Sequence, residues 1–296
     1  MRSPGTPTVD QLQVLLAVID SGSFTGAAKR LGRAVSAISY AIDTLEAQLG
    51  VSLFIRGSTR RPKLTEAGEA VFSEARAVTL SVETLRARVR GLVDGLEPEV
   101  SLVIDSMYPV DHLAVVLKDF HAKFATVPLR LLVQSLNGVE RAIRNGEAAI
   151  GVGSAAHMDI RGFRQSLIEP VRIIPVAAPK HPLASTGDAS SARVLEHVQL
   201  VLTDQPDVEG RDHGVVSQAI WRVADLNLKH RLILRGMGWG GLPEPMVRAD
   251  IEAGRLVRLQ LDDYRGGDYT LHVVHKIETP PGPAGQWLIE RLRAPR

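Results

Sequence analysis

A chain of 296 residues suits two or three domains and is too long for one ordinary single core. Its 45% hydrophobic and 23% charged residues exclude a fibre and a disordered chain, and the absence of cysteine excludes disulfides, thiolate metal sites and cysteine nucleophiles. The first ten residues contain no apolar secretory core, and the early apolar run from Val14 to Ile19 is far shorter than the roughly 20 residues that span a bilayer. We therefore expect a cytoplasmic protein with no membrane partner.

The net charge of +2 is divided unevenly along the chain. Residues 1–65 hold eight basic and four acidic residues, a net of +4, whereas residues 66–296 hold 27 basic and 29 acidic residues, a net of −2. A basic head on a slightly acidic body is typical of phosphate binding confined to one end, although an imbalance of four charges is also compatible with chance.

Two helices are predicted before residue 32. Thr8 and Gln11 have the spacing of a capping box, and an apolar repeat at helical spacing follows them. A second, short helix is predicted from Phe24 to Leu31, with Gly32 as its stop.

A third predicted helix begins within three or four residues and has two distinct faces. Its apolar stripe consists of Ile38, Ile42, Leu45 and Leu49, and its polar face carries Ser36, Ser39, Tyr40 and Asp43. Two helices joined by a tight turn, with a polar face on the second, describe a helix-turn-helix, whose second helix fits the roughly 12 Å major groove. An ordinary three-helix bundle fits these periodicities equally well.

The segment after Gly50 favours the helix-turn-helix. Residues 52–55 and 62–65 are predicted to form a short hairpin around a tip at 56–61. The basic residues in or beside this tip are Arg56, Arg60, Arg61 and Lys63. A basic hairpin beside a presented helix is a wing suited to phosphates or the minor groove, and a domain that only mediates association has no need of it.

From Glu69 to Leu92 the sequence predicts one long helix with a strict heptad seam. The seam residues are Val71, Ala75, Val78, Val82, Leu85, Val89 and Leu92. At about 1.5 Å per residue the helix is roughly 35 Å long, and a narrow seam of this kind is best buried against another long helix. We infer a dimer; the alternative is a helix lying on its own domain.

The remaining residues alternate between strands and helices in two units. The first unit comprises strands at 100–104, 129–133 and 149–152, with helices around 113–124 and 139–144. The second comprises strands at 173–177, 200–203 and 232–234 with helices at 213–223 and 243–253, after which a strand at 269–275 and a helix at 284–292 return to the first. The alternation predicts mainly parallel sheets covered on both sides, in two lobes that place a ligand cleft beyond the carboxyl ends of the strands.

An ordered set of residues in the first 68 positions carries a family resemblance. It comprises residues 23–28 with Leu31, residues 36–39 with Ile42, Leu45 and Glu46, then Leu49 and Gly50, Leu53, Phe54 and Arg56, and residues 64–68. Weaker matches follow at Phe120, 127–129, Gly146, 149–150, 180–184, 236–238, 242–243 and 254–256. In these positions the sequence resembles the LysR-type transcriptional regulators.

Three residues depart from the family pattern. Ala34 stands where the family usually has a serine that would cap the recognition helix, and Val35 stands where a polar residue is common. Tyr40 occupies a position where arginine or histidine is common. Ala34 and Val35 imply that base readout at this end of the helix differs from the family's, and the role of Tyr40, a base contact or a phosphate contact, stays open.

The resemblance implies an α/β protein with an N-terminal all-α winged helix-turn-helix, a long linker helix and a two-lobed α/β effector domain similar to periplasmic binding proteins. We assign residues 1–66 to the DNA-binding domain, 67–93 to the linker (dimerisation) helix and 94–296 to the effector domain. Its lobes are expected at about 94–160 with 268–296, and at about 161–267. The implied partners are a pseudo-palindromic double-stranded DNA site, a small-molecule effector, and further copies of the chain, in a homodimer or homotetramer held by the linker helix and effector domain.

Site residues follow from the same resemblance and from the predicted faces. We expect DNA contacts from Thr25, Arg33, Ser36, Ser39, Tyr40, Asp43, Arg56, Arg60 and Arg61. We expect effector contacts from Ser106, Tyr108, Ser135, Asn137, Thr203, Met237 and Trp239, although a polar residue at a strand end caps a neighbouring helix about as often as it binds a ligand. Tyr108 and Trp239 favour an aromatic or flat effector.

Several other signals are interpreted as structural. Gly236, Gly238 and Gly241 fit a dinucleotide motif, but they lie near the end of the chain, where close packing explains them more simply. His272 and His275 would face opposite sides of a strand, so we expect no metal site. The sequence contains no serine-centred nucleophile elbow and no evident pair of carboxylates, so we expect no catalytic residue, and we expect no cofactor. Two rival functions remain open: a two-lobed enzyme or binding protein whose N-terminal helices mediate association, and a constitutive repressor whose cleft is empty.

Overall fold

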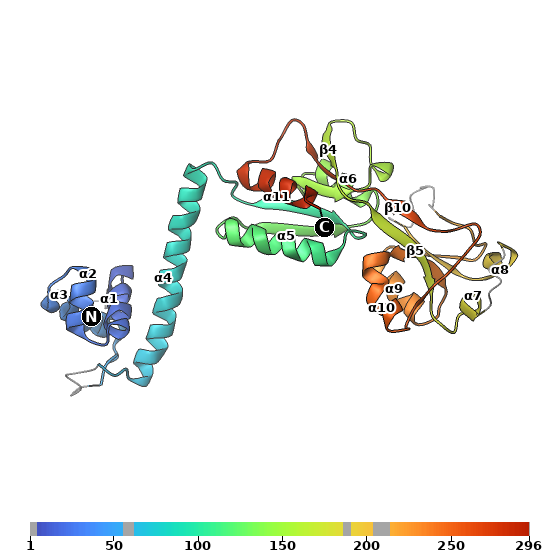
Figure 1. Ribbon diagram of the computed structural model, residues 1–296. Helices are drawn as coiled ribbons and strands as arrows, with labels where there is room; N and C mark the ends of the chain where they lie inside the picture. Colours follow the sequence, from blue (N-terminus) through green and yellow to red (C-terminus); the bar gives the residue numbers. More distant parts are fainter. Residues whose placement is uncertain (1–4, 56–61, 186–190, 204–213, 296) are drawn as a thin grey trace. The chain divides into compact units, whose positions relative to one another are not determined.

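The computed structural model describes residues 5–55, 62–185, 191–203 and 214–295. The chain divides into two compact units, residues 1–90 and residues 91–296, and each is described by itself (Figure 1). In the described residues, no helix is long and apolar enough to cross a membrane.

The first unit is all-α, as the sequence predicts. Its helices are α1 (Val9–Asp20), α2 (Phe24–Leu31), α3 (Val35–Leu49) and α4 (Glu66–Val93). The predicted capping box is present, since the Thr8 side chain accepts a hydrogen bond from the Gln11 amide while Gln11 reaches back to the Thr8 amide. Gly32 ends α2 in the left-handed conformation, at φ 63°, which glycine adopts without steric cost.

The hydrophobic stripes of α1, α2 and α3 form one core. Its members with no exposed surface are Val14, Leu15, Val18, Ala27, Ile38, Leu45 and Leu53. Val71 and Ala75 at the start of α4 pack against this core. The first turns of α4 therefore lie on their own domain, so at that end the seam follows the alternative to helix pairing between two chains.

The base of the predicted hairpin is present after α3. Phe54 and Leu64 form an antiparallel bridge, and the Ile55 amide donates to the Lys63 carbonyl at 2.8 Å. Glu46 on α3 fixes the incoming strand, because its carboxylate accepts hydrogen bonds from the amides of Leu53 and Phe54. The predicted tip, residues 56–61, lies outside the described residues.

The second unit contains two mixed sheets. The first has the order β2-β1-β3-β11-β4 and consists of β2 (Leu129–Gln134), β1 (Val100–Asp105), β3 (Ile150–Gly153), β11 (His272–Lys276) and β4 (Phe163–Leu167). Strands β1, β2 and β3 are parallel, and β11 runs antiparallel to both neighbours. Helices α5 (Val110–Lys123) and α11 (Pro283–Arg293) share one core with alternate residues of β1, and α6 (Gly138–Arg144) packs with Val103 in another.

The second sheet has the order β10-β5-β8-β6-β7, with β9 (Val257–Arg258) paired to β5. Its strands are β10 (Gly267–Tyr269), β5 (Val171–Ala177), β8 (Trp239–Pro243), β6 (Gln199–Leu202) and β7 (Ile220–Val223). The remaining helical segments are α7 (Pro182–Ser185), α8 (Ser191–Glu196), α9 (Leu226–Leu234), α10 (Glu244–Glu252) and a 3-10 turn at Ala155–His157. The chain crosses between the sheets twice, from β4 to β5 and from β10 to β11 (Figure 1).

Several elements of the second lobe differ from the sequence prediction. Residues 232–234, predicted as a strand, end helix α9, because Asp225 caps it through the Leu228 amide at 2.6 Å and Leu226 and Ile233 share its buried face. The helix predicted at 213–223 is wrong, since Ile220–Val223 pairs in parallel with β6; His213 lies outside the described residues. A short apolar run fits a strand and a buried helix equally well, which explains both errors.

The predicted boundary between the lobes also needs correction, whereas the predicted strand direction is confirmed. Strand β4 falls in the range predicted for the second lobe, but it pairs with β11 in the first sheet. The segment that contains Gly236, Gly238 and Gly241 contributes strand β8 from Trp239 onward. In each sheet all but one strand run in the same direction, as the sequence predicts; the exceptions are β11 in the first sheet and β5 in the second.

Candidate functional site

Helix α3 presents the predicted polar face to solvent. Ser36, Tyr40 and Asp43 are exposed and Ser39 is half-buried. Of the opposite stripe, Ile38, Ile42 and Leu45 are packed in the core, and Leu49 is exposed. Tyr40 is the most prominent of these, with 73% of its surface exposed. A large exposed aromatic with a hydroxyl is available to contact another molecule without disturbing the domain.

The amino end of α3 has no side-chain cap. Ala34 occupies the cap position and makes no side-chain hydrogen bond, as its lack of a polar group requires. A helix amino end carries partial positive charge and points amide donors outward, so a phosphate oxygen is a suitable partner there. Thr25, in the first turn of α2, is also exposed.

The basic residues of this unit are placed differently from one another. Arg33 is exposed but paired, since its guanidinium holds Asp10 through two hydrogen bonds of 2.8 and 2.6 Å. Lys63 is exposed at the base of the hairpin. Arg56, Arg60 and Arg61 lie outside the described residues.

Beyond its first turns, α4 carries an unpartnered apolar stripe in the single chain. Among the seam residues, Val78, Leu85, Val89 and Leu92 are exposed, and Val82 is half-buried. The seam is therefore divided, with Val71 and Ala75 packed on the N-terminal core and the remainder available to a second helix.

Two of the predicted effector residues meet at the carboxyl end of the first sheet. Ser106 follows β1 and Ser135 follows β2, and their hydroxyl oxygens lie 2.9 Å apart. Asn137 begins α6 without a side-chain capping bond. Between them Leu136 has φ 51°, a left-handed conformation that is uncommon for a branched residue and indicates local constraint.

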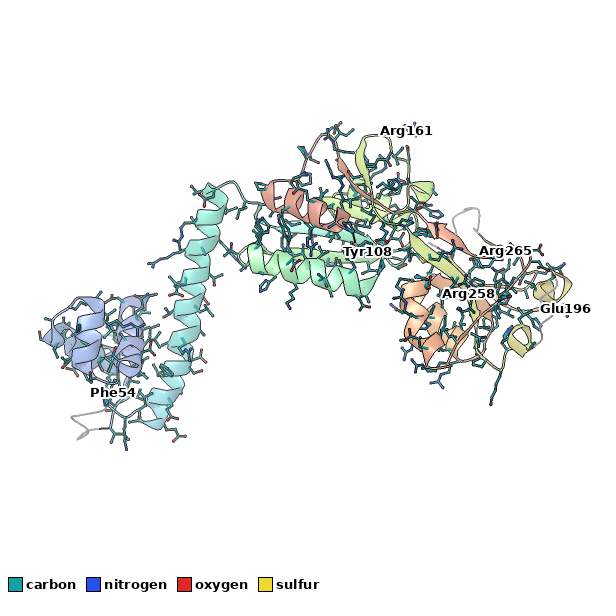
Figure 2. All side chains as sticks on the ribbon, in the orientation of Figure 1. Phe54, Tyr108, Arg161, Glu196, Arg258 and Arg265 are labelled. Atoms are coloured by element: carbon teal, nitrogen blue, oxygen red, sulfur yellow. The ribbon has the colours of Figure 1, made fainter. Side chains whose placement is uncertain are left out.

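The other predicted effector residues do not join this pair. Tyr108, labelled in Figure 2, is 5% exposed within the core of α5, and its hydroxyl hydrogen-bonds His112 Nδ1 at 2.6 Å. Thr203 is half-buried at the end of β6, where its amide donates to the Val223 carbonyl. Helix packing fixes Tyr108, so its ring has a structural role.

Trp239 begins a strand of the second sheet, and Met237 lies in the segment that leads into it. Trp239 of β8 pairs with Ala177 at the carboxyl end of β5. The chain crosses between the sheets near the other end of β5, where Ile173 pairs with Pro243. Trp239 is fully buried beside Tyr264, and Met237 is exposed just before β8. No contact of either residue with the Ser106–Ser135 pair is found in the described part of the chain, and both stay sequence-based predictions of effector contact.

Sequence reasoning missed a buried carboxylate beside the serine pair. Asp105, the last residue of β1, is completely buried, and it accepts hydrogen bonds from the Met107 amide and the Tyr269 hydroxyl, each at 2.8 Å. The Leu136 amide also donates to it. Burial raises the pKa of Asp105 to about 6, against the lowering effect of these donors. The available signal was a charged residue that ends an apolar strand.

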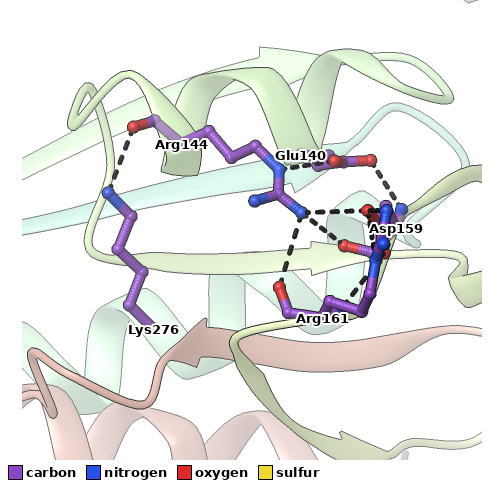
Figure 3. Close-up of polar contacts among 5 residues, drawn as sticks. All are labelled: Glu140, Arg144, Asp159, Arg161 and Lys276. Carbon is purple, nitrogen blue, oxygen red and sulfur yellow. Dashed lines mark hydrogen bonds and ion pairs between the residues drawn. The ribbon is translucent and has the colours of Figure 1, made fainter.

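A surface network fixes the loop after β3 (Figure 3). Arg144 on α6 donates to Glu140 Oε1 at 2.6 Å, and Glu140 Oε2 accepts the Asp159 amide at 2.7 Å. The Arg161 guanidinium lowers the pKa of Asp159 to about 2, and Lys276 donates to the Arg144 carbonyl at 3.1 Å. The charges of the network are paired with one another, so we interpret it as a structural link between α6, the loop after β3 and β11.

Comparison with known proteins covers nearly the whole chain. Residues 9–69 match the model of the bacterial regulatory helix-turn-helix proteins of the lysR family, and residues 94–295 match the LysR substrate binding domain. The HTH-type transcriptional regulator AceR of Acinetobacter baumannii is 26% identical over 292 residues, covering 97% of both chains. The HTH-type transcriptional activator AllS of Klebsiella pneumoniae is 26% identical over 265 residues, covering 84% of this chain and 93% of its own.

Solved structures share the fold at lower identity. A mutant of OxyR from Corynebacterium glutamicum aligns with a TM-score of 0.52 and 18% identity, covering 98% of this chain and 93% of its own. Full-length LysG of the same organism aligns with a TM-score of 0.51 and 23% identity, covering 97% and 96%. Both alignments include the helical first unit and the two-sheet second unit.

Proposed function

Because the chain belongs to the LysR family of DNA-binding transcriptional regulators, with that family's effector-binding domain at residues 94–295, we propose how its two units act. Helix α3 enters the major groove of double-stranded DNA, and a small molecule bound beside the first sheet controls that binding. The exposed polar face of α3 carries this proposal, because a polar helix face that has no partner among the described residues is suited to base edges.

The DNA contacts fall into two kinds. Ser36, Ser39, Tyr40 and Asp43 on α3 face the bases, while Thr25 and the uncapped amino end of α3 lie beside phosphates. Arg56, Arg60 and Arg61 remain sequence-based proposals for phosphate or minor-groove contacts. Arg33 is proposed as a phosphate neighbour whose charge is shared with Asp10.

Two copies of the domain are proposed to bind one pseudo-palindromic site. The exposed part of the α4 seam supports pairing of linker helices, in a homodimer or a homotetramer completed by the effector domains. We assign residues 1–66, 67–93 and 94–296 to the DNA-binding, linker and effector parts. Because the partner is promoter DNA, we place the chain in the cytoplasm.

Footprinting on the duplex upstream of the chain's own gene tests the DNA proposal. We expect two protected half-sites separated by about one helical turn, 10 to 10.5 base pairs, or a multiple of it. The Tyr40→Ala variant should weaken both half-sites together. Protection of a single unpaired site, or identical protection by wild type and variant, would contradict paired recognition through α3.

The effector is proposed to bind at the hydroxyl pair of Ser106 and Ser135, with Asn137 beside it; Thr203 at the end of β6 remains a sequence-based proposal for a contact from the second lobe. Its binding changes the angle between the lobes and hence the spacing of the paired heads and the DNA bend. A metabolite panel screened by thermal shift tests this site, since a ligand of the folded state raises the melting temperature. The shift should disappear in Ser135→Ala and persist in Ser81→Ala, an exposed serine on α4. Equal shifts in both variants would place the ligand elsewhere, and no shift with any metabolite would favour a constitutive regulator.

A further inference from the structure

The Asp105 carboxylate joins three strand ends of the first sheet to one crossing strand. Asp105 itself ends β1, and Leu136, which follows β2, donates its amide to the carboxylate. Tyr269 of β10 donates its hydroxyl to Oδ2, and the Ser154 side chain after β3 hydrogen-bonds the same phenol. One buried carboxylate thus connects residues separated by up to 164 positions in the sequence.

Tyr269 stands where the chain passes between the sheets. It pairs with Val171 at the start of β5, so the two crossing segments are held side by side there (Figure 1). Its ring packs against the core clusters of both lobes and stacks on His157, with centroids 6.0 Å apart. A change in the angle between the lobes therefore acts on Tyr269 directly.

The same carboxylate fixes the proposed effector residues. Asp105 directly precedes Ser106, and Leu136 directly follows Ser135, so the bonds of Asp105 to both backbone segments contribute to holding the two hydroxyls at this distance. The amide bond to Asp105 also offsets the cost of the left-handed conformation at Leu136.

Packing alone does not explain an acidic residue at this place. Burying a carboxylate is costly unless it is fully hydrogen-bonded, and an apolar side chain would fill the same space without that cost. The donors to Asp105 in the described part of the chain are two amides and one phenol, so no cation there compensates its charge. A carboxylate is needed because its oxygens accept all three bonds together.

We propose that Asp105 and Tyr269 are positioning residues that couple the crossing strands to the serine pair. When the lobes rotate, Tyr269 pulls on the carboxylate and the separation of the Ser106 and Ser135 hydroxyls changes. In the opposite direction, a molecule bound between the serines holds Tyr269 and the lobe angle in one arrangement. This coupling rests on the proposed effector function of the serine pair.

Amide hydrogen exchange of the full-length chain tests the coupling without any effector. We expect Tyr269→Phe to speed exchange at the Met107 and Leu136 amides about tenfold or more, because the bond that steadies their acceptor is lost. Exchange within the β1–β2 ladder should stay as in wild type. Tyr264→Phe is the matched control, since that half-buried phenol packs against Trp239 in a different cluster.

The double variant separates coupling from a general loss of structure. Asp105→Asn should speed the same two amides, and Asp105→Asn with Tyr269→Phe should add little beyond either single change, because both remove one shared bond. A folded Tyr269→Phe protein with wild-type exchange at Met107 and Leu136 would overturn the proposal. If Tyr269→Phe does not fold, wild-type exchange at the Met107 and Leu136 amides in a folded Asp105→Asn protein would overturn the proposal.

The hydrogen-exchange measurement and the effector-binding measurement can fail separately, so the failure of the coupling is distinguishable from the failure of the proposed function. Faster exchange at both amides in a chain that binds no metabolite would support the coupling and refute the effector role of the serines. Unchanged exchange in a chain whose thermal shift depends on Ser135 would refute the coupling and support the effector role of the serines.

Discussion

The Arg33 guanidinium and the Asp10 carboxylate form an ion pair with two hydrogen bonds, from Nη1 to Oδ2 at 2.8 Å and from Nη2 to Oδ1 at 2.6 Å. The pair joins the first turn of α1 to the turn before α3, and the hydrogen bonds from Arg33 lower the pKa of Asp10. Arg33, which the sequence predicts to contact DNA, is therefore part of an ion pair that has no net charge.

Removing the carboxylate of Asp10 should leave the Arg33 guanidinium available to a DNA phosphate. We predict that Asp10→Asn steepens the dependence of log K on log salt by about one unit, because one more cation displaces a condensed counterion. The melting temperature should hardly change, since exposed ion pairs contribute little to stability. Fluorescence anisotropy with a labelled duplex between about 50 and 200 mM salt measures the slope. In Asp10→Asn with Arg33→Gln it should return to the wild-type value; an unchanged slope in Asp10→Asn would remove Arg33 from the interface.

Tyr40 should affect sequence preference and leave stability unchanged. Its side chain is free of the core, so Tyr40→Ala should melt like wild type. We expect the ratio of specific to random binding to fall roughly fivefold to tenfold, as a lost base contact requires. Competition between native and random duplexes measures the ratio. Tyr40→Phe distinguishes the hydroxyl from the ring, and an undiminished ratio in Tyr40→Ala would mean that Tyr40 contacts no base.

The exposed seam of α4 should determine assembly. Leu85→Glu with Val89→Glu places charge on the stripe without touching the core, so each chain should fold as before. We predict that the dissociation constant of the dimer rises on the order of tenfold or more, because charged residues at seam positions oppose helix pairing. Analytical ultracentrifugation over a range of concentrations measures it. Arg90→Glu, on the other side of α4, is the control, and an unaltered dimer in the double variant would place the interface outside the linker helix.

Asp105 should make stability depend on pH in a defined direction. Burial raises its pKa from 3.8 to about 6, so between these values the folded chain holds a proton that the unfolded chain has lost. Folding is therefore favoured at low pH, and this contribution is lost as the pH rises through about 6. Relative to Asp105→Asn, wild type should lose up to roughly 3 kcal/mol of unfolding free energy between about pH 4 and pH 7. Denaturant titrations of both proteins give this difference, and parallel curves would show that Asp105 titrates normally.

Local signals predicted the first unit well. The Thr8 capping box, the Gly32 stop and the alternation of buried and exposed residues on α3 are all short-range patterns, and the structure contains each of them. The absence of a side-chain cap at Ala34 could also be seen directly in the sequence.

Long-range pairing explains most of what the sequence could not predict. Nothing near β4 indicates that it pairs with β11, more than a hundred residues later, or that Trp239 lies at the end of β8 away from the crossing. The role of Asp105 depends on Tyr269 in the same way, because their contact exists only once both sheets are assembled. The Ser106–Ser135 pair was predictable because consecutive parallel strands end at the same edge.

The most direct test of the account is a salt titration of the purified full-length chain on double-stranded DNA from its own upstream region, with random duplex as competitor. We predict clear preference for the native duplex and a log K that falls linearly with log salt, by about 0.9 for each phosphate neutralised. A folded dimer that binds native and random duplexes equally at every salt concentration would contradict sequence-specific regulation and place the function in the two-lobed domain.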